Sequence, residues 1–208
     1  MRTDPVTATV VRLGIVAPSR GRTARAVHLG ATLDGVLDEV FEGVPVPHRR
    51  PTWFRRAEGD ATTVIIPPTV PHSWVATELV ALLGGALGRR NRHLNEFGRL
   101  RLRVAADHGD VVLRPPHFGG AAVALATWLC AAEELKAAIA AAPELDLLLV
   151  VSDRFHTALA GDEGYRRIVV PAGGEREIAW LRTGPDTGTR NTGADGGLAP
   201  LPTERGPR

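Results

Sequence analysis

EGDATTVIIPP, residues 58–68, carries the strongest indication of how this chain folds. Glu58-Gly59-Asp60 predicts a hairpin turn, because glycine and aspartate adopt the backbone conformations of tight turns at little cost. The β-branched run 62–66 predicts the strand after the turn, and Pro67-Pro68 ends it. Trp53-Phe54 predicts the strand before the turn, so the segment as a whole is a β-hairpin.

Strands and helices are also predicted on both sides of this hairpin. Upstream, residues 7–16 are rich in β-branched side chains and predict a strand. Apolar residues recur at helical spacing over 29–41 and again over 75–87, which predicts two amphipathic helices that Thr23 and Thr69 can cap.

The C-terminal half continues with alternating elements. Leu100, Leu102 and Val104 alternate with arginines, which predicts a strand with one polar face. The other elements predicted there are a turn at 107–110, a returning strand at 111–113, an alanine-rich helix at 119–142, a buried strand at 147–151, and a strand pair at 167–170 and 178–181.

This order of elements predicts an α+β domain over residues 1–183. We expect a mostly antiparallel sheet with about three helices packed on one face. Residues 184–208 contain little that is apolar, so they predict a disordered tail.

Composition excludes several classes of protein. No stretch approaches the roughly 20 apolar residues of a membrane helix, and residues 1–5 do not open a secretory signal. The single cysteine, Cys130, cannot form an internal disulfide and reads as a small buried apolar residue. We expect a cytoplasmic protein without membrane contact. The net charge of +2 is too small to favour a nucleic-acid partner by itself.

Four strings in this order resemble the class III nucleotidyl cyclase homology domain, and most of all a short actinobacterial subfamily of it. They are the hairpin 58–68, the strand and turn 100–111, the helix start 120–129 and the strand 150–155. The resemblance implies a ferredoxin-like cyclase palm. It also implies a site between two subunits, where two carboxylates hold two divalent metals against a nucleoside triphosphate. An asparagine and an arginine one helical turn apart would stabilise the transition state.

The catalytic positions implied by this resemblance have mostly changed. The first metal-binding aspartate aligns with Arg12, and the second survives as Asp60, a relic metal ligand or an ordinary turn residue. The asparagine and arginine align with Ala124 and Trp128. We therefore expect no intact catalytic residue and no bound metal. Magnesium or manganese is expected only if some nucleotide binding persists.

These losses favour a pseudoenzyme, a dimerising, regulatory or partner-binding signalling module, over an enzyme. The expected partner is a second copy or a related chain, with a separate effector protein. Gly119, Gly120 and Trp128 are the predicted interface residues, because helix 119–128 is uncharged and begins with small side chains. The helix could instead be buried wholly inside one domain by Trp53, Trp74 and the neighbouring strands.

Two alternatives remain. One is an active cyclase that converts a purine nucleoside triphosphate to a cyclic nucleotide and pyrophosphate together with an intact partner subunit. The other is a nucleic-acid binder built on arginines 99, 101 and 103, with 89, 90 and 92 nearby, although a solvated strand face explains this stripe as well.

Phe118 beside the old catalytic surface could pack in the core or contact a partner. Asp107, His108, Asp110 and His117 have no metal-ligand spacing and predict a solvated turn.

Overall fold

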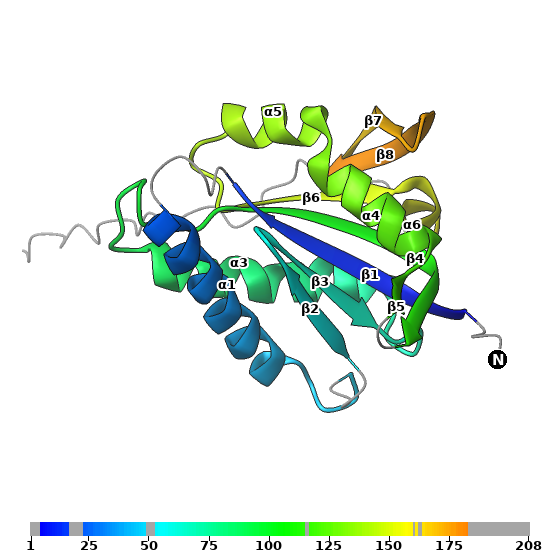
Figure 1. Cartoon of the computed structure of the whole chain (residues 1–208), viewed down its shortest axis with the longest axis horizontal. Coiled ribbons are helices and arrows are strands. Elements are labelled where there is room, and N and C mark those ends of the chain that lie inside the picture. The colour runs from blue at the N-terminus through cyan, green and yellow to red at the C-terminus, as the bar shows by residue number, and fades with distance from the viewer. Residues whose placement is uncertain are drawn as a thin grey trace, which may run out of the picture.

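The computed structural model describes residues 5–16, 23–48, 53–114, 117–159, 161 and 164–182. The predicted tail at 184–208, and the predicted end of the domain at residue 183, lie outside these ranges. Figure 1 shows one sheet with helices packed against it.

The sheet has eight strands in the order β2-β3-β1-β4-β6-β8-β7, with β5 paired to β4. All pairs are antiparallel except β4 and β6, which run parallel. The strands are β1 Val6–Ile15, β2 Phe54–Glu58, β3 Ala61–Ile66, β4 Leu102–Arg114, β5 His117–Gly119, β6 Leu147–Ser152, β7 Tyr165–Ala172 and β8 Glu175–Arg182. The mostly antiparallel α+β class and the hairpin at 58–60 are thus confirmed.

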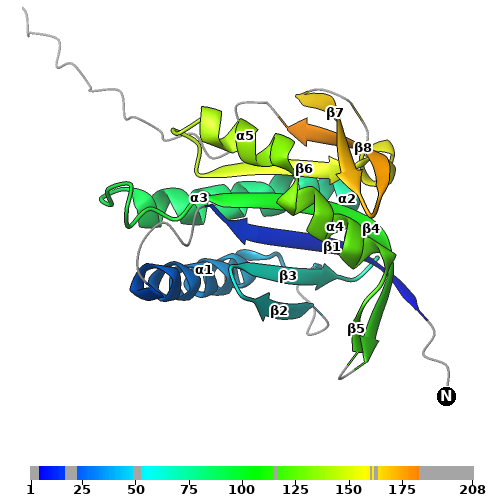
Figure 2. The same ribbon diagram turned by 45° about the horizontal axis from the view of Figure 1, so that its top comes forward.

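The helices cover both faces of the sheet, which corrects the prediction that they pack on one face. Their bounds are α1 Thr23–Gly43, α2 His72–Trp74, η1 Val75–Leu79, α3 Val80–Asn91, α4 Ala121–Ala131, α5 Glu133–Ala141 and α6 Asp153–Thr157. Buried residues of α1 and α3 pack with Leu102, Val104 and Ala106 of β4. Buried residues of α4 and α5 pack instead with Ala105 on the opposite face. In both views α3 passes behind the strands and α4 in front of them (Figures 1 and 2).

The two faces follow from strand periodicity. In the first half of β4 the even positions carry Leu102, Val104 and Ala106, and these are buried against α1 and α3. On β6, by contrast, Leu147 to Val151 are buried on both faces, as the uninterrupted apolar run predicts. A strand that buries apolar side chains on both of its faces needs helices on both sides of the sheet to cover them.

Two local predictions fail near the start of α4. Residues 107–110 are not a turn, because β4 continues through them to Arg114 while paired with β1. The predicted helix 119–142 is two helices, since the backbone turns extended at Ala132 (φ −58°, ψ 139°). Gly120 sets where α4 begins: its φ is +119°, and a Cβ there would lie 2.4 Å from the carbonyl oxygen of Asp110.

The helix predicted after Thr69 is continuous from His72 to Asn91 but contains a π-helical segment, η1. A π segment leaves helix carbonyls out of the ordinary i to i+4 pattern. Here the Arg182 guanidinium at the end of β8 donates to the Ala76 carbonyl, so the last described strand is fastened to this helix.

Candidate functional site

Arg12 occupies the centre of the surface where a metal-binding carboxylate was expected. It lies on β1 opposite Thr63 of β3, and its side chain is 12% exposed. Its Nη1 forms an ion pair with Glu58 Oε2 and donates to Thr63 Oγ1 at 2.5 Å. The guanidinium is therefore held in place on the face of the sheet that α4 covers.

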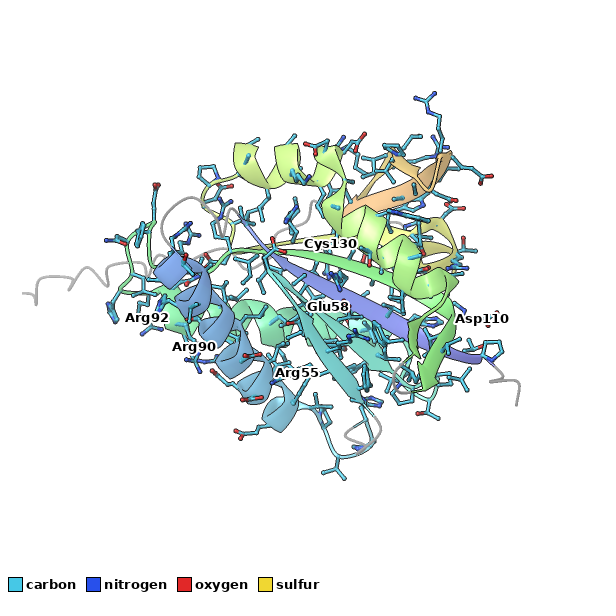
Figure 3. All side chains as sticks on the ribbon, in the orientation of Figure 1. Arg55, Glu58, Arg90, Arg92, Asp110 and Cys130 are labelled. Atoms are coloured by element: carbon cyan, nitrogen blue, oxygen red, sulfur yellow. The ribbon has the colours of Figure 1, made fainter. Side chains whose placement is uncertain are left out.

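Glu58 is the partner that sequence reasoning missed. It is the last residue of β2, directly before the hairpin turn, and its side chain also lies 3.5 Å from Arg56 Nε. The turn folds the end of β2 back beside β1 and β3, which brings an acid from position 58 to a base at position 12. Figure 3 labels Glu58 on this hairpin. An arginine in a strand expected to be buried needs an acid beside it, and this need is the signal in the sequence that could have pointed to Glu58.

Asp60 is exposed in the turn itself, beside Gly59 with φ +64°. Its backbone carbonyl accepts a hydrogen bond from Ile15 N at 2.9 Å, which fastens the turn to the end of β1. The observed geometry fits a turn aspartate. The resemblance to cyclases implies two metal-binding carboxylates, and only Asp60 is an acid at those two positions.

A divalent metal pair does not fit these residues. The Arg12 guanidinium adds positive charge where two cations would have to bind, and Glu58 already uses an oxygen on Arg12. Among the described residues, no three histidine, cysteine, aspartate or glutamate side chains gather closely enough to hold a metal ion.

Ala124 and Trp128 lie one turn apart on α4. The Trp128 side chain is 43% exposed, and its ring covers the β7–β8 turn: a Cβ on Gly173 would lie 2.6 Å from Trp128 Cη2. Trp53 and Trp74 do not bury it, because they pack with the α1 and α3 side of the core. Gly119 is half-buried and Gly120 exposed at the start of the same helix.

Cys130 closes the space between α4 and the first strand. It is buried, as predicted, and a Cβ on Gly14 would lie only 2.9 Å from its Sγ. Burial raises the pKa of the Cys130 thiol to about 11, against an opposing effect of Arg103 and Arg12. Figure 3 shows Cys130 on α4. The surface beneath this part of α4 is therefore filled by protein side chains.

Phe118 contacts the hairpin rather than α4 alone. Its ring centroid lies 5.4 Å from that of Phe54, and Arg56 sits over its face at 4.8 Å. Phe118 also packs on the small apolar cluster beneath the start of α4. Core packing, one of the two roles predicted for Phe118, thus accounts for part of its contacts.

The predicted solvated turn at 107–110 is wrong for Asp107, which is fully buried. Asp107 accepts from Ser152 Oγ at 2.6 Å and from Arg154 Nε at 2.7 Å, and its hydrogen bond raises the pKa of Arg154. His108 lies on the opposite face, with its ring 4.4 Å from that of His72. Burial and His108 lower the pKa of His72. Asp110 is exposed, and the side chain of His117 lies outside the described parts.

The arginine stripe is not a solvated face either. Arg99 is 8% exposed and forms an ion pair with buried Asp146. Arg101 donates to backbone carbonyls near the end of α5, and Arg103 Nη2 donates to Ile15 O at 3.3 Å. On α3, Arg89 and Arg90 pair with Glu39 of α1, while Arg92 is exposed (Figure 3).

Solved structures of bacterial cyclases have this arrangement of strands and helices. One structure of a bacterial light-regulated adenylyl cyclase superposes with a TM-score of 0.61 at 10% identity, over 90% of this chain and 54% of that one. A second covers 90% of this chain and 94% of its own, with a TM-score of 0.56 and 11% identity. An adenylate/guanylate cyclase/hydrolase from Silicibacter pomeroyi gives a TM-score of 0.59 at 14% identity, over 88% and 99%.

The chain has a nucleotidyl-cyclase-like fold. At these identities the likeness shows the fold alone, and the chain spans about half the length of the first structure. No protein-family model and no curated protein matches the sequence. Within the described residues, no helix of this cyclase-like domain is long and apolar enough to cross a membrane.

Proposed function

We propose that this chain is a catalytically degenerate cyclase-like domain that works as a dimerising or regulatory module. The observation that carries the proposal is the Arg12–Glu58 ion pair, with its hydrogen bond to Thr63. The resemblance to cyclases assigns the first metal-binding carboxylate to position 12. A cyclase must concentrate divalent metal and triphosphate there, and an internally neutralised guanidinium does not attract either.

The α4 positions support the same conclusion. Ala124 has no hydrogen-bonding side chain for a ribose, and the Trp128 indole cannot neutralise a phosphate. Removing one transition-state donor typically lowers a rate by on the order of a hundredfold or more. With three positions changed together, we expect no measurable cyclase activity. Any remaining nucleotide binding, with magnesium or manganese, would be weak.

An active cyclase completed by an intact partner is less well supported. Such a half-site needs either the metal carboxylates or the helix pair, and this chain keeps only Asp60 of the four positions. A nucleic-acid binder is also less well supported, because Arg99 and Arg101 are engaged with Asp146 and with backbone carbonyls.

A partner surface on the α4 side is supported by its composition. Helix α4 carries no charged residue, and Trp128, Leu113 and Phe54 are each more than a third exposed on this half of the molecule. Tryptophan is enriched at the centres of protein interfaces. We propose that a second copy or a related chain covers this surface, and that a separate protein carries the output.

Activity is tested by incubating the purified chain with ATP or GTP and with magnesium or manganese, and by measuring cyclic product by mass spectrometry. We expect none above a blank without enzyme. Turnover that Asp60→Ala abolishes would contradict the proposal.

Assembly is tested by sedimentation at micromolar concentration. We expect a dimer that Trp128→Ala weakens, while Trp74→Ala on the α1 and α3 side leaves it intact. A monomer with an unchanged mass for Trp128→Ala, and with no binding to a related chain, would contradict the proposed module.

A further inference from the structure

Two histidines from distant parts of the chain meet on the face of the sheet that α1 and α3 cover. His72 is the first residue of α2, and His108 lies on β4, on the same side of that strand as the apolar residues that pack against α1 and α3. Their ring centroids are 4.4 Å apart. The His72 ring also lies 5.2 Å from that of Phe155 on α6, which is fully buried. This contact joins the start of the continuous helix 72–91 to the sheet.

The two rings lie where a positive charge is poorly stabilised. The His108 Nδ1 atom is buried, and no hydrogen-bond partner for it is found among the described residues. The same is true of the Oγ1 atom of Thr9, which lies opposite His108 on β1 and is fully buried. Burial lowers the pKa of His72, the neighbouring His108 lowers it further, and no carboxylate in the described parts of the chain raises it.

The charged residues of α6, and Asp107 of β4, already have other partners. Asp107 lies on the opposite face of the sheet and accepts from Arg154 Nε at 2.7 Å. Asp153 accepts from Trp180 Nε1 at 2.8 Å, and the His156 ring stacks on the Trp180 ring at a centroid distance of 3.9 Å. These side chains are committed to contacts outside the histidine pair.

Other charged residues of the surrounding elements are exposed or lie elsewhere. Asp110 of β4 and Glu78 of η1 are exposed. Arg12, the charged residue of β1, lies on the face that α4 covers, and β3 carries no charged residue. Arg182 of β8 donates to the Ala76 carbonyl, one turn after the start of α2. Protonation of both histidine rings would therefore place two positive charges side by side without a carboxylate between them.

Two such charges weaken the contact between α2 and β4. Like charges at this separation repel each other, and the buried side of the pair screens them less than water does. The unfolded chain, in which histidine titrates at about pH 6.5, accepts these protons more readily. The stabilisation that the uncharged His72 provides is therefore present above about pH 6.5 and is lost as the pH falls through the lowered pKa of this residue.

We propose that His72 and His108 form a pH-dependent latch, in which two uncharged rings hold the start of helix 72–91 against β4 and two protonated rings release it. The hydrogen bond from Arg182 to Ala76 fixes the helix one turn further on, so the release is confined to the first turn. The latch lies on the face opposite the Arg12–Glu58 pair, so it does not depend on whether the chain retains cyclase activity.

Hydrogen exchange of the full chain tests the latch. It is read by mass spectrometry at pH 7.5 and at pH 5.5, with a correction for the intrinsic exchange rate at each pH. The peptide that spans 70–79 includes the Val75 amide, which donates to Pro71 O at 3.2 Å across the first turn. We expect acidification to lower the protection of this peptide several-fold, while the peptide that spans 83–91 of α3 keeps its protection.

His72→Gln and His108→Gln each remove one of the two charges, so both variants should lose much less protection on acidification. At pH 5.5 His72→Gln should be more protected than the parent chain, a gain that a damaged fold cannot give. His28→Gln, at an exposed histidine of α1, is the matched control and should behave as the parent chain does.

If His108→Gln does not fold, His72→Gln decides the question. The proposal is overturned if acidification lowers protection equally along residues 70–91, or if His72→Gln loses as much protection as the parent chain does.

Discussion

The two faces of the sheet are built from different chemistry. On the side of α1 and α3, strand β4 presents Leu102, Val104 and Ala106 to an aliphatic core. On the side of α4 and α5, the same strand and the residues before it present arginines, together with buried Asp107. The first face therefore depends on apolar burial, and the second combines its own apolar clusters with buried charges that must be neutralised.

Neutralisation differs from one arginine to the next on that second face. Arg12 and Arg99 form ion pairs with Glu58 and Asp146, whereas the hydrogen bonds of Arg101 go to backbone carbonyls. Each arginine of this face is therefore held by its own set of partners.

The largest effect is expected from Asp146→Ala. This change leaves Arg99 buried without its acid, which typically lowers the free energy of unfolding by about 3–5 kcal/mol. Urea unfolding followed by circular dichroism measures it. Leu83→Ala in the aliphatic core is the matched comparison, with an expected loss of about 2–5 kcal/mol.

If Asp146→Ala instead costs less than about 1 kcal/mol while Leu83→Ala behaves as expected, the polar face contributes little to stability. The contrast between the faces would then concern function alone.

An intermediate effect is expected from the alkaline titration of Cys130. This thiol lies in the apolar cluster beneath α4, with Arg103 and Arg12 nearby. Burial raises the pKa of its thiol from 9.0 to about 11. The folded state therefore keeps this proton more tightly than the unfolded chain does. The contribution of the protonated thiol to the free energy of unfolding is complete below about pH 9 and is lost as the pH rises through 11. Its full value is roughly 2–3 kcal/mol.

Urea unfolding at pH 8 and at pH 10.5 measures this loss, and Cys130→Ala serves as the reference because it keeps every other titrating group. The parent chain should lose more stability than Cys130→Ala over this interval. Equal losses would show that the space under α4 is more hydrated than its packing indicates.

The smallest effect is expected from Arg55→Ala on β2. Arg55 pairs with Asp34 and Asp38 of α1, whose side chains are 51% and 66% exposed. Exposed pairs of this kind contribute about 0–1 kcal/mol, and salt screens them. A thermal melt at low and high salt should show a shift of a few degrees at most. A loss as large as that of Asp146→Ala would mean that burial does not distinguish the arginines of this protein.

Local sequence was enough to predict several elements. The hairpin at Glu58-Gly59-Asp60, the buried strand at 147–151 and the last strand pair all rest on turn residues and on apolar periodicity within a few positions. The same periodicity indicated that one face of residues 100–104 would be apolar and the other basic, as observed. Conformational preferences of neighbouring residues decide such features, so they can be read without knowledge of the partner strands.

Contacts between distant residues could not be predicted in this way. Arg12 meets Glu58 across 46 positions, and Arg99 meets Asp146 across 47. Whether an arginine is solvated, paired with an acid or held by carbonyls depends on which segment the fold brings beside it. The arginine types and their common face were visible in the sequence. Their partners and the placement of helices on both faces depend on long-range packing. Sequence spacing does not show which acid or carbonyl the fold brings beside a buried charge.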